Sequence, residues 1–189
     1  MISYKTLLNN RRSIRDFKPD KVSPALLEEI LNETCMAPSA SNSQPWRFII
    51  IQDRALIERL SAESKKNLLE TIKKDQNSSF KRYERILSSP NTNVFYNAPC
   101  LVLFCGKNDY SFFASDFALA VAYFMFAATS RGLGTCWVGL GDKIKDPKLK
   151  NEIGLPENYE IAATVILGSP AKIPDVVPRK SPVILKTIA

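Results

Sequence analysis

The sequence predicts an α+β fold in which helices cover both faces of one sheet. The continuous apolar run at residues 98–105 is typical of a strand that is covered on both faces, and the stretch 160–167 predicts another apolar strand, with both alternating and continuous character. Stretches with apolar residues at helical spacing separate the expected strands. The length of 189 residues fits one domain, and neither an internal repeat nor a linker divides the chain. We therefore expect residues 1–189 to form a single domain.

The first half of the chain predicts a helix, a strand and a longer helix. A Ser-Pro pair marks the start of the first helix, at 23–35, because serine can accept a hydrogen bond from an early backbone N–H and proline is tolerated at the first helical position. The apolar run 46–52 predicts a strand, and an aspartate then opens a helix over 53–74. The polar stretch 76–93 suggests a mobile excursion over the core rather than a part of it.

The second half predicts the centre of the sheet and the helix that covers it. The apolar run 98–105, bounded by a proline and a glycine, predicts the central strand. A long core helix at 109–131 follows, and Gly132 suits the left-handed cap that would close it. The remaining elements are a strand at 135–140, a helix at 146–153, a strand at 160–167 and a strand-like tail at 182–189.

The composition is that of an ordinary globular protein, with 45% hydrophobic and 24% charged residues. The start of the chain lacks an apolar stretch long enough for a signal peptide, and the apolar run 117–129 is shorter than the ~20 residues that span a bilayer. We therefore expect a cytoplasmic protein without a membrane span. The net charge is +7, but the basic run 143–150 lacks aromatic residues to stack bases, so nucleic-acid binding is not expected.

The chain contains no histidine. This excludes histidine-based triads and imidazole general-base chemistry, and it favours an enzyme whose reactivity comes from a cofactor. The cysteines lack the closely spaced pairs of zinc sites, so we expect no metal site and buried, reduced thiols, with Cys100 and Cys105 on opposite faces of one strand. Asp116 is interpreted as a helix-end residue bonded to backbone rather than as an acid or base.

Two motifs near the start carry most of the functional information. Arg11, Arg12, Ser13 and Arg15 suit a grip on a phosphate, because each guanidinium presents paired donors that match phosphate oxygens. A solvated basic turn is the alternative interpretation of this motif. The second motif is the loop 37–46, which is rich in small polar residues and leads into an apolar strand. Alone, that loop could be a simple turn between a helix and a strand.

Together, the two motifs resemble the N-terminal signature of the nitroreductase family of flavin-dependent oxidoreductases. A glycine-rich segment at 132–141 and the closing segments 168–170 and 178–180 match later parts of the family pattern, whereas 54–97 is unmatched. The resemblance implies a nitroreductase-like three-layer sandwich with one mixed or antiparallel sheet. It also implies a homodimer in which the C-terminal strand is exchanged with the partner, so that an exposed sheet edge is covered.

The resemblance assigns one group of residues to the phosphate of FMN. Arg11, Arg12 and Ser13 would hold the ribityl phosphate, and the basic pair Arg179 and Lys180 would return to it from the C-terminal part of the chain. A pair of surface residues is the competing interpretation of Arg179 and Lys180.

A second group is assigned to the flavin ring. Arg15 would approach the N1 and O2 side, where a cation stabilises the negative charge that two-electron reduction adds. Gly139 and Leu140 would present backbone N–H groups to N5 and O4, which glycine permits through close approach. The residues expected to lie against the flavin bound mainly by the other subunit are Pro38, Ser39 and Asn42.

The activity implied by the resemblance is a transfer of hydride from NAD(P)H to the flavin and then to a nitroaromatic, a quinone or a similar small acceptor. The protein would position and polarise the reactants, so no catalytic side chain is predicted. The unmatched segment 54–97 would select the acceptor. A reductive dehalogenase of the same fold and a flavin-binding storage or sensor protein without turnover are the alternatives, and an anion-binding module is a weaker one.

Overall fold

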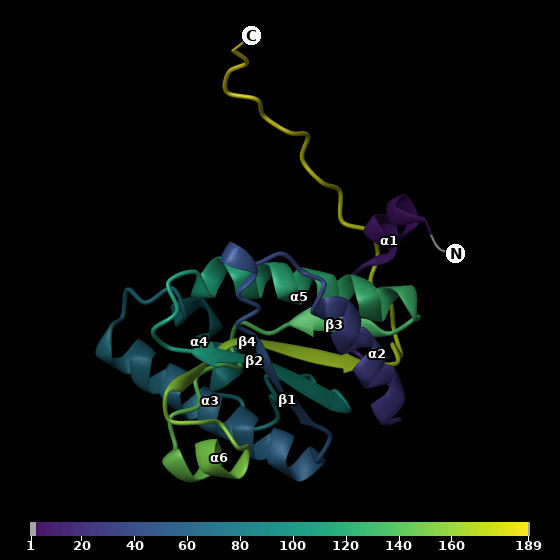
Figure 1. Cartoon of the computed structure of the whole chain (residues 1–189). Coiled ribbons are helices and arrows are strands. Elements are labelled where there is room, and N and C mark those ends of the chain that lie inside the picture. The colour runs from purple at the N-terminus through teal and green to yellow at the C-terminus, as the bar shows by residue number, and fades with distance from the viewer. Residues whose placement is uncertain (1–2, 189) are drawn as a thin grey trace.

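The computed structural model describes residues 3–188 and confirms the α+β prediction. Four strands form one antiparallel sheet in the order β1-β2-β4-β3 (Figure 1). Their bounds are β1 Arg47–Ile51, β2 Cys100–Lys107, β3 Gly134–Trp137 and β4 Tyr159–Gly168. The strand predicted to be central, β2, pairs with β1 on one side and with β4 on the other.

Helices cover both faces of this sheet, as predicted (Figure 1). The helices of one face are α2 Pro24–Thr34 and α5 Phe113–Ser130, and those of the other are α3 Arg54–Lys74, α4 Glu84–Leu87 and α6 Pro147–Glu152. Residues of β2 alternate between the two cores, so that Cys100 packs on the α5 side and Cys105 on the α3 side. Both thiols are free and buried, which confirms the expectation for these cysteines.

The helix starts follow the capping signals in the sequence. The Ser23 hydroxyl accepts a hydrogen bond from the backbone N–H of Leu26 at 3.3 Å, and the Asp53 carboxylate accepts one from Leu56 at 2.8 Å. Gly132 adopts the left-handed conformation, with φ of 74°, just after the end of α5. Helix α1, Tyr4–Asn10, was not predicted from the sequence, and it buries none of its side chains.

Residues 76–93 were expected to form a mobile excursion over the core rather than a part of it, and one side chain of the segment contradicts the second half of this expectation. The segment contains a short 3₁₀ helix, Lys81–Tyr83, followed by α4, and the Leu87 side chain is only 1% exposed within the core of the α3 side. The ammonium group of Lys65 in α3 also donates hydrogen bonds to two backbone carbonyls of this segment, at 2.6 and 2.9 Å. Leu87 therefore belongs to the core, whereas the other residues of 76–93 are exposed or half-buried over it.

The end of β3 and the C-terminal tail differ from the strands that the sequence predicts. The strand expected at 135–140 ends at Trp137, because the chain then turns, with the Gly141 N–H donating to the Val138 carbonyl at 3.2 Å. The strand-like tail runs extended and exposed away from the domain in the single chain (Figure 1). Its pairing with a partner therefore stays a prediction, and residue 189 lies outside the described residues.

Helix α5 is long and apolar enough to cross a membrane by length and composition alone. Its inner side is buried against the sheet, where Phe117, Val121 and Phe124 are at most 1% exposed. We therefore identify it as a core helix. Its outer side exposes further large apolar side chains, among them Leu119 and Tyr123.

Candidate functional site

The segment that carries the N-terminal arginines is fixed along the edge of the sheet. Ser13 forms a parallel bridge with Thr135, and the Ile14 N–H donates to the Thr135 carbonyl at 2.9 Å. The Ile14 side chain is buried against Gly134, where an added Cβ would lie 2.6 Å from Ile14 Cγ1. Glycine at 134 is thus required for the close approach, and the neighbouring arginines are held beside β3.

The arginine motif meets the C-terminal segment around a cavity of about 420 Å³. The site residues that line it are Arg11, Arg12, Ser13, Arg15 and Arg179. The structure therefore brings together residues that are more than 160 positions apart in the sequence, whereas Lys180 does not line this cavity.

The cations of this cavity are not neutralised by salt bridges. Among residues 3–188, none of the ion pairs involves Arg11, Arg12, Arg15 or Arg179. One carboxylate, Asp175, also lines the cavity. Four guanidinium groups around one cavity leave donors available for an anion such as a phosphate.

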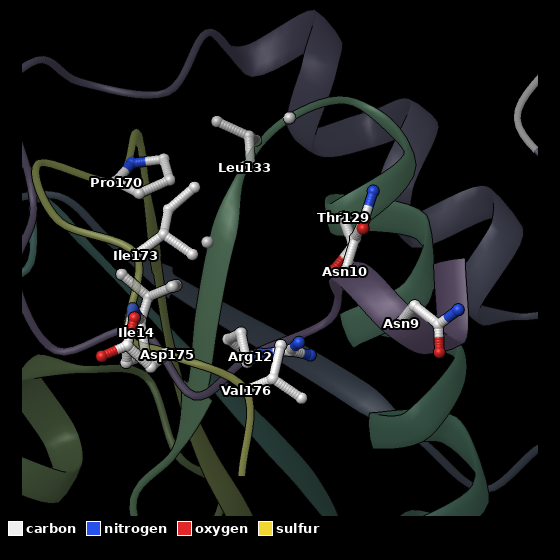
Figure 2. A pocket seen from close by; sticks show the side chains of 13 residues that line it. Asn9, Asn10, Arg12, Ile14, Thr129, Leu133, Pro170, Ile173, Asp175 and Val176 are labelled. Atoms are coloured by element: carbon white, nitrogen blue, oxygen red, sulfur yellow. The ribbon is translucent and has the colours of Figure 1, made fainter. Parts of the chain in front are cut away.

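A second cavity, of about 550 Å³, adjoins the first, and Arg12, Asp175 and Val176 line both. Figure 2 shows Arg12 beside Asp175 and Val176 of the C-terminal segment. Thr129 and Gly132 line this second cavity, which places the cation cluster at the C-terminal end of α5.

Arg15 lies farther along the same edge. Its Nη1 donates to the Ser13 carbonyl at 3.4 Å, and its Cζ lies 5.7 Å from the centre of the Tyr96 ring. Because Ser13 pairs with Thr135 in parallel, the two segments run in the same direction, and Gly139 follows two residues after the end of β3 at Trp137. The predicted phosphate contacts, Arg15 and Gly139 therefore succeed one another along one edge.

The segment around Gly139 is open on one side and anchored on the other. A Cβ at Gly139 would meet no atom within 4 Å, and among residues 3–188 no acceptor is found for the backbone N–H of Gly139 or Leu140. The Leu140 carbonyl, in contrast, accepts a hydrogen bond from the buried Ser64 hydroxyl at 2.6 Å. A Cβ at Gly141 would collide with the Phe95 ring. Two available donors on a fixed turn fit the expected contacts with a flavin ring.

The predicted loop residues Pro38, Ser39 and Asn42 lie in a separate place. Asp116, in the first turn of α5, accepts hydrogen bonds from the Ala40 backbone N–H at 3.0 Å and from the Tyr110 hydroxyl at 2.6 Å. The interpretation of Asp116 as a residue bonded to backbone is therefore confirmed.

The loop is also held from within. The Ser39 hydroxyl accepts from the Gln44 N–H at 3.0 Å, and Ser41, Asn42 and Gln44 have left-handed φ values of 51°, 53° and 45°. Gln44 in turn donates through its amide to the Asn42 side chain at 3.2 Å. These hydrogen bonds stabilise a loop conformation that L-residues rarely adopt.

The two parts of the predicted site lie at opposite ends of α5. The loop is attached to its first turn, whereas the cation cluster adjoins its last turn, and a helix of 18 residues is about 27 Å long (Figure 1). One chain therefore does not bring Pro38, Ser39 and Asn42 to its own arginines.

Three of the four cysteine thiols, Cys100, Cys105 and Cys136, are buried in the sheet. Burial raises the pKa of both Cys100 and Cys105 to about 12, so these thiols stay protonated at neutral pH. Burial also raises the pKa of Cys136, and the charge of the nearby Arg15 opposes this rise. Within residues 3–188, no group of three or more Cys, Asp or Glu side chains could hold a metal ion.

Sequence reasoning missed Tyr96, which contacts Arg15, and Ser64, which fixes the Leu140 carbonyl. Ser64 carried a weak signal, since a buried serine on an otherwise apolar helix stripe needs a hydrogen-bond partner. Tyr96 carried none, because its contact depends on an unusual backbone conformation.

Comparisons with known proteins agree with this architecture. A model described as the Nitroreductase family matches residues 8–169. A protein of Archaeoglobus fulgidus named "Putative NADH dehydrogenase/NAD(P)H nitroreductase" is 28% identical over 170 residues, which are 87% of this chain and 83% of that protein. An iodotyrosine deiodinase of Thermotoga neapolitana is 29% identical over 132 residues, covering 68% of this chain and 69% of its own length.

A solved structure is similar over nearly the whole chain. The crystal structure of a nitroreductase with bound FMN from Desulfitobacterium hafniense has a TM-score of 0.79 and 26% sequence identity, and the match covers 97% of this chain and 100% of that chain. The nitroreductase-like sandwich expected from the sequence is confirmed.

Proposed function

Because the chain belongs to the Nitroreductase family, we propose that it is an FMN-dependent oxidoreductase that passes electrons from NAD(P)H to a small acceptor. The proposal rests on the arrangement of groups along the edge of the sheet where residues 11–15 lie beside β3. Cations without salt-bridge partners gather at one end of it, and two backbone donors beside open space lie at the other. A solved relative of this fold is described with bound FMN.

The residues present fit the two ends of FMN. Arg11, Arg12, Ser13 and Arg179 would hold the phosphate through charge-assisted hydrogen bonds. Lys180 would join them only through a rearrangement of the C-terminal segment, because it does not line the cavity in the single chain.

The ring would lie farther along β3. The N–H groups of Gly139 and Leu140 would donate to its polar edge, and the missing side chain of Gly139 leaves room for it. Arg15 would place a positive charge where reduction adds negative charge.

When bound, FMN would supply the chemistry by accepting a hydride from NAD(P)H and passing the electrons to a nitroaromatic, a quinone or a similar acceptor. The protein would bind both reactants in turn and hold them over the ring. Residues 54–97, which include the turn at Tyr96 beside Arg15, would shape the place of the acceptor. A cytoplasmic location stays a prediction from the sequence.

We also propose a homodimer, because one chain separates the loop 38–42 from its own cation cluster by the length of α5. The outer side of α5 exposes Leu119 and Tyr123, and the extended tail exposes Val183, Ile184 and Leu185. Apolar patches of this kind are typical of surfaces that a partner covers. In such a dimer, Pro38, Ser39 and Asn42 would contact the flavin of the partner subunit.

Reductive dehalogenation is a second candidate within the same fold. It is favoured by the similarity to an iodotyrosine deiodinase, and it would use the same flavin contacts. A protein that stores or senses flavin without turnover would also share them, so only reactivity distinguishes the three.

The proposal is tested on the purified protein. A flavin spectrum, with FMN identified by mass after release, should be bleached by NADH or NADPH without oxygen and restored by a nitroaromatic or a quinone. A protein that keeps FMN but is not bleached by either nucleotide would support the flavin-binding alternative. Restoration by a halotyrosine with release of halide would support the dehalogenase, and a colourless protein that does not take up FMN would refute the proposal.

A further inference from the structure

The turn that precedes β2 presents an exposed tyrosine to Arg15. The Arg15 Cζ lies 5.7 Å from the centre of the Tyr96 ring, within the ~6 Å over which an aromatic face attracts a cation. The hydrogen bond from Arg15 to the Ser13 carbonyl is long, at 3.4 Å, and Arg15 forms no salt bridge within residues 3–188. The Tyr96 ring and the Ser13 carbonyl are therefore the two groups that the structure places against this guanidinium.

The backbone at this tyrosine is unusual. Tyr96 and Asn97 both have left-handed φ values, 54° and 53°, a conformation that is a genuine outlier for a bulky residue such as tyrosine. Such a conformation persists only where the surroundings impose it. Three hydrogen bonds do so here: from the Phe95 N–H to the Asn93 side chain at 2.8 Å, from the Tyr96 N–H to the Asn93 carbonyl at 3.0 Å, and from the Ala98 N–H to the Phe95 carbonyl at 3.0 Å.

The residues before Tyr96 attach the turn to the rest of the site. The Val94 N–H donates to the Ser61 hydroxyl of α3 at 2.9 Å, and the Phe95 side chain is fully buried against Gly141. Tyr96, by contrast, is 40% exposed. The chain thus buries one aromatic residue on the glycine-rich turn and, by its left-handed backbone, directs the next one toward Arg15.

We propose that Tyr96 is a positioning residue that holds Arg15 beside the flavin without neutralising its charge. A carboxylate at this place would also hold the arginine, but it would cancel much of the field that stabilises the reduced flavin. An aromatic face attracts the cation and leaves its full charge available. This inference rests on the proposed function, because it concerns the potential of bound FMN.

The test uses Tyr96→Asn, since asparagine tolerates left-handed φ and so keeps the turn while removing the ring. The substitution is introduced into the natural protein and into the Arg15→Gln variant. For each protein, redox titration gives the midpoint potential of bound FMN, and anaerobic mixing with NADH gives the rate at which the flavin is bleached. In the natural background we expect a lower potential, with the preference for the reduced flavin weakened roughly two- to fivefold. In the Arg15→Gln background Tyr96→Asn should have no further effect, because the cation is already absent.

A control variant separates this role from a structural one. Tyr96→Phe keeps the ring and should therefore keep the potential of the natural protein.

The outcomes distinguish this inference from the proposed function. A natural protein that takes up no FMN would overturn both. If FMN binds and Tyr96→Asn leaves its potential unchanged, or lowers it equally in both backgrounds, then only the role of Tyr96 is refuted.

Discussion

Replacing Arg179 with alanine should weaken the binding of FMN but not that of riboflavin, which has the same ring system and no phosphate. The expectation follows from geometry, because Arg179 lines the same cavity as Arg11, Arg12 and Ser13 and forms no salt bridge within residues 3–188. Lys180 supplies a matched control, since it is the next residue in the chain, carries the same charge and does not line the cavity.

The magnitude can be worked from the contact that is lost. A hydrogen bond to a charged group contributes about 1.5–3 kcal/mol, and a factor of ten in Kd corresponds to about 1.4 kcal/mol. The expected loss for FMN is therefore roughly 10- to 150-fold, and the exposure of Arg179 favours the lower end of this range. Lys180→Ala should change the Kd for FMN by only about twofold, because water and salt screen the attraction between the phosphate and an exposed charge outside the cavity.

The assay is the titration of flavin-free protein with FMN and, in parallel, with riboflavin, followed by the quenching of flavin fluorescence. Arg179→Ala should differ from the natural protein only in the FMN titration. If both ligands lose affinity equally, Arg179 supports the structure of the site rather than the phosphate. If Lys180→Ala has the larger effect, the conformation of the C-terminal segment in the flavin-bound protein differs from that of the single chain.

Light scattering should report a dimer, and a monomer that binds FMN tightly would refute a site built from two chains. Gly139→Ala should change the free energy of unfolding by no more than about 0.5 kcal/mol, since a Cβ there meets no atom within 4 Å, but it should weaken FMN binding. Gly141→Ala should destabilise the fold, because its Cβ would collide with Phe95. If both variants lowered stability equally, the space beside Gly139 would not be open. Leu87→Ala should lower the free energy of unfolding, measured in denaturant, by about 2–5 kcal/mol. Ile86→Ala, at an exposed position, should lower it by about 0.5 kcal/mol or less, and equally small effects of both variants would contradict the burial of Leu87.

The elements with strong local signals could be predicted from the sequence. The Ser-Pro pair before α2 and the aspartate before α3 are caps with a defined chemistry, and the structure shows both accepting the expected backbone hydrogen bonds. The apolar run of β2 could be placed centrally because burial on both faces leaves no polar alternation. These signals act within a few residues, so a single sequence contains them.

The parts that were missed depend on contacts between distant segments. Helix α4 has four residues, too few for a periodic stripe, and the burial of Leu87 depends on its packing in the core between α3 and the sheet. The arginine motif and Arg179 were assigned to one phosphate through resemblance alone, because no local rule links positions so far apart. The contact of Tyr96 with Arg15 requires left-handed φ values at Tyr96 and Asn97, and a glycine stands at neither position.

In the proposed dimer, α5 sets the spacing of the two sites. Each chain would contribute the cation cluster to one flavin and the loop 38–42 to the other, and these groups lie at opposite ends of the same 18-residue helix. Two-fold symmetry makes the two flavin sites equivalent, so a change at the interface alters the affinity for FMN equally at both sites. Because the loop can reach a flavin only across the interface, cofactor binding and association of the chains stabilise each other by mass action. The hydrogen bond from the Ala40 N–H to Asp116, at 3.0 Å, would link the loop to the first turn of α5 and so contribute to this coupling.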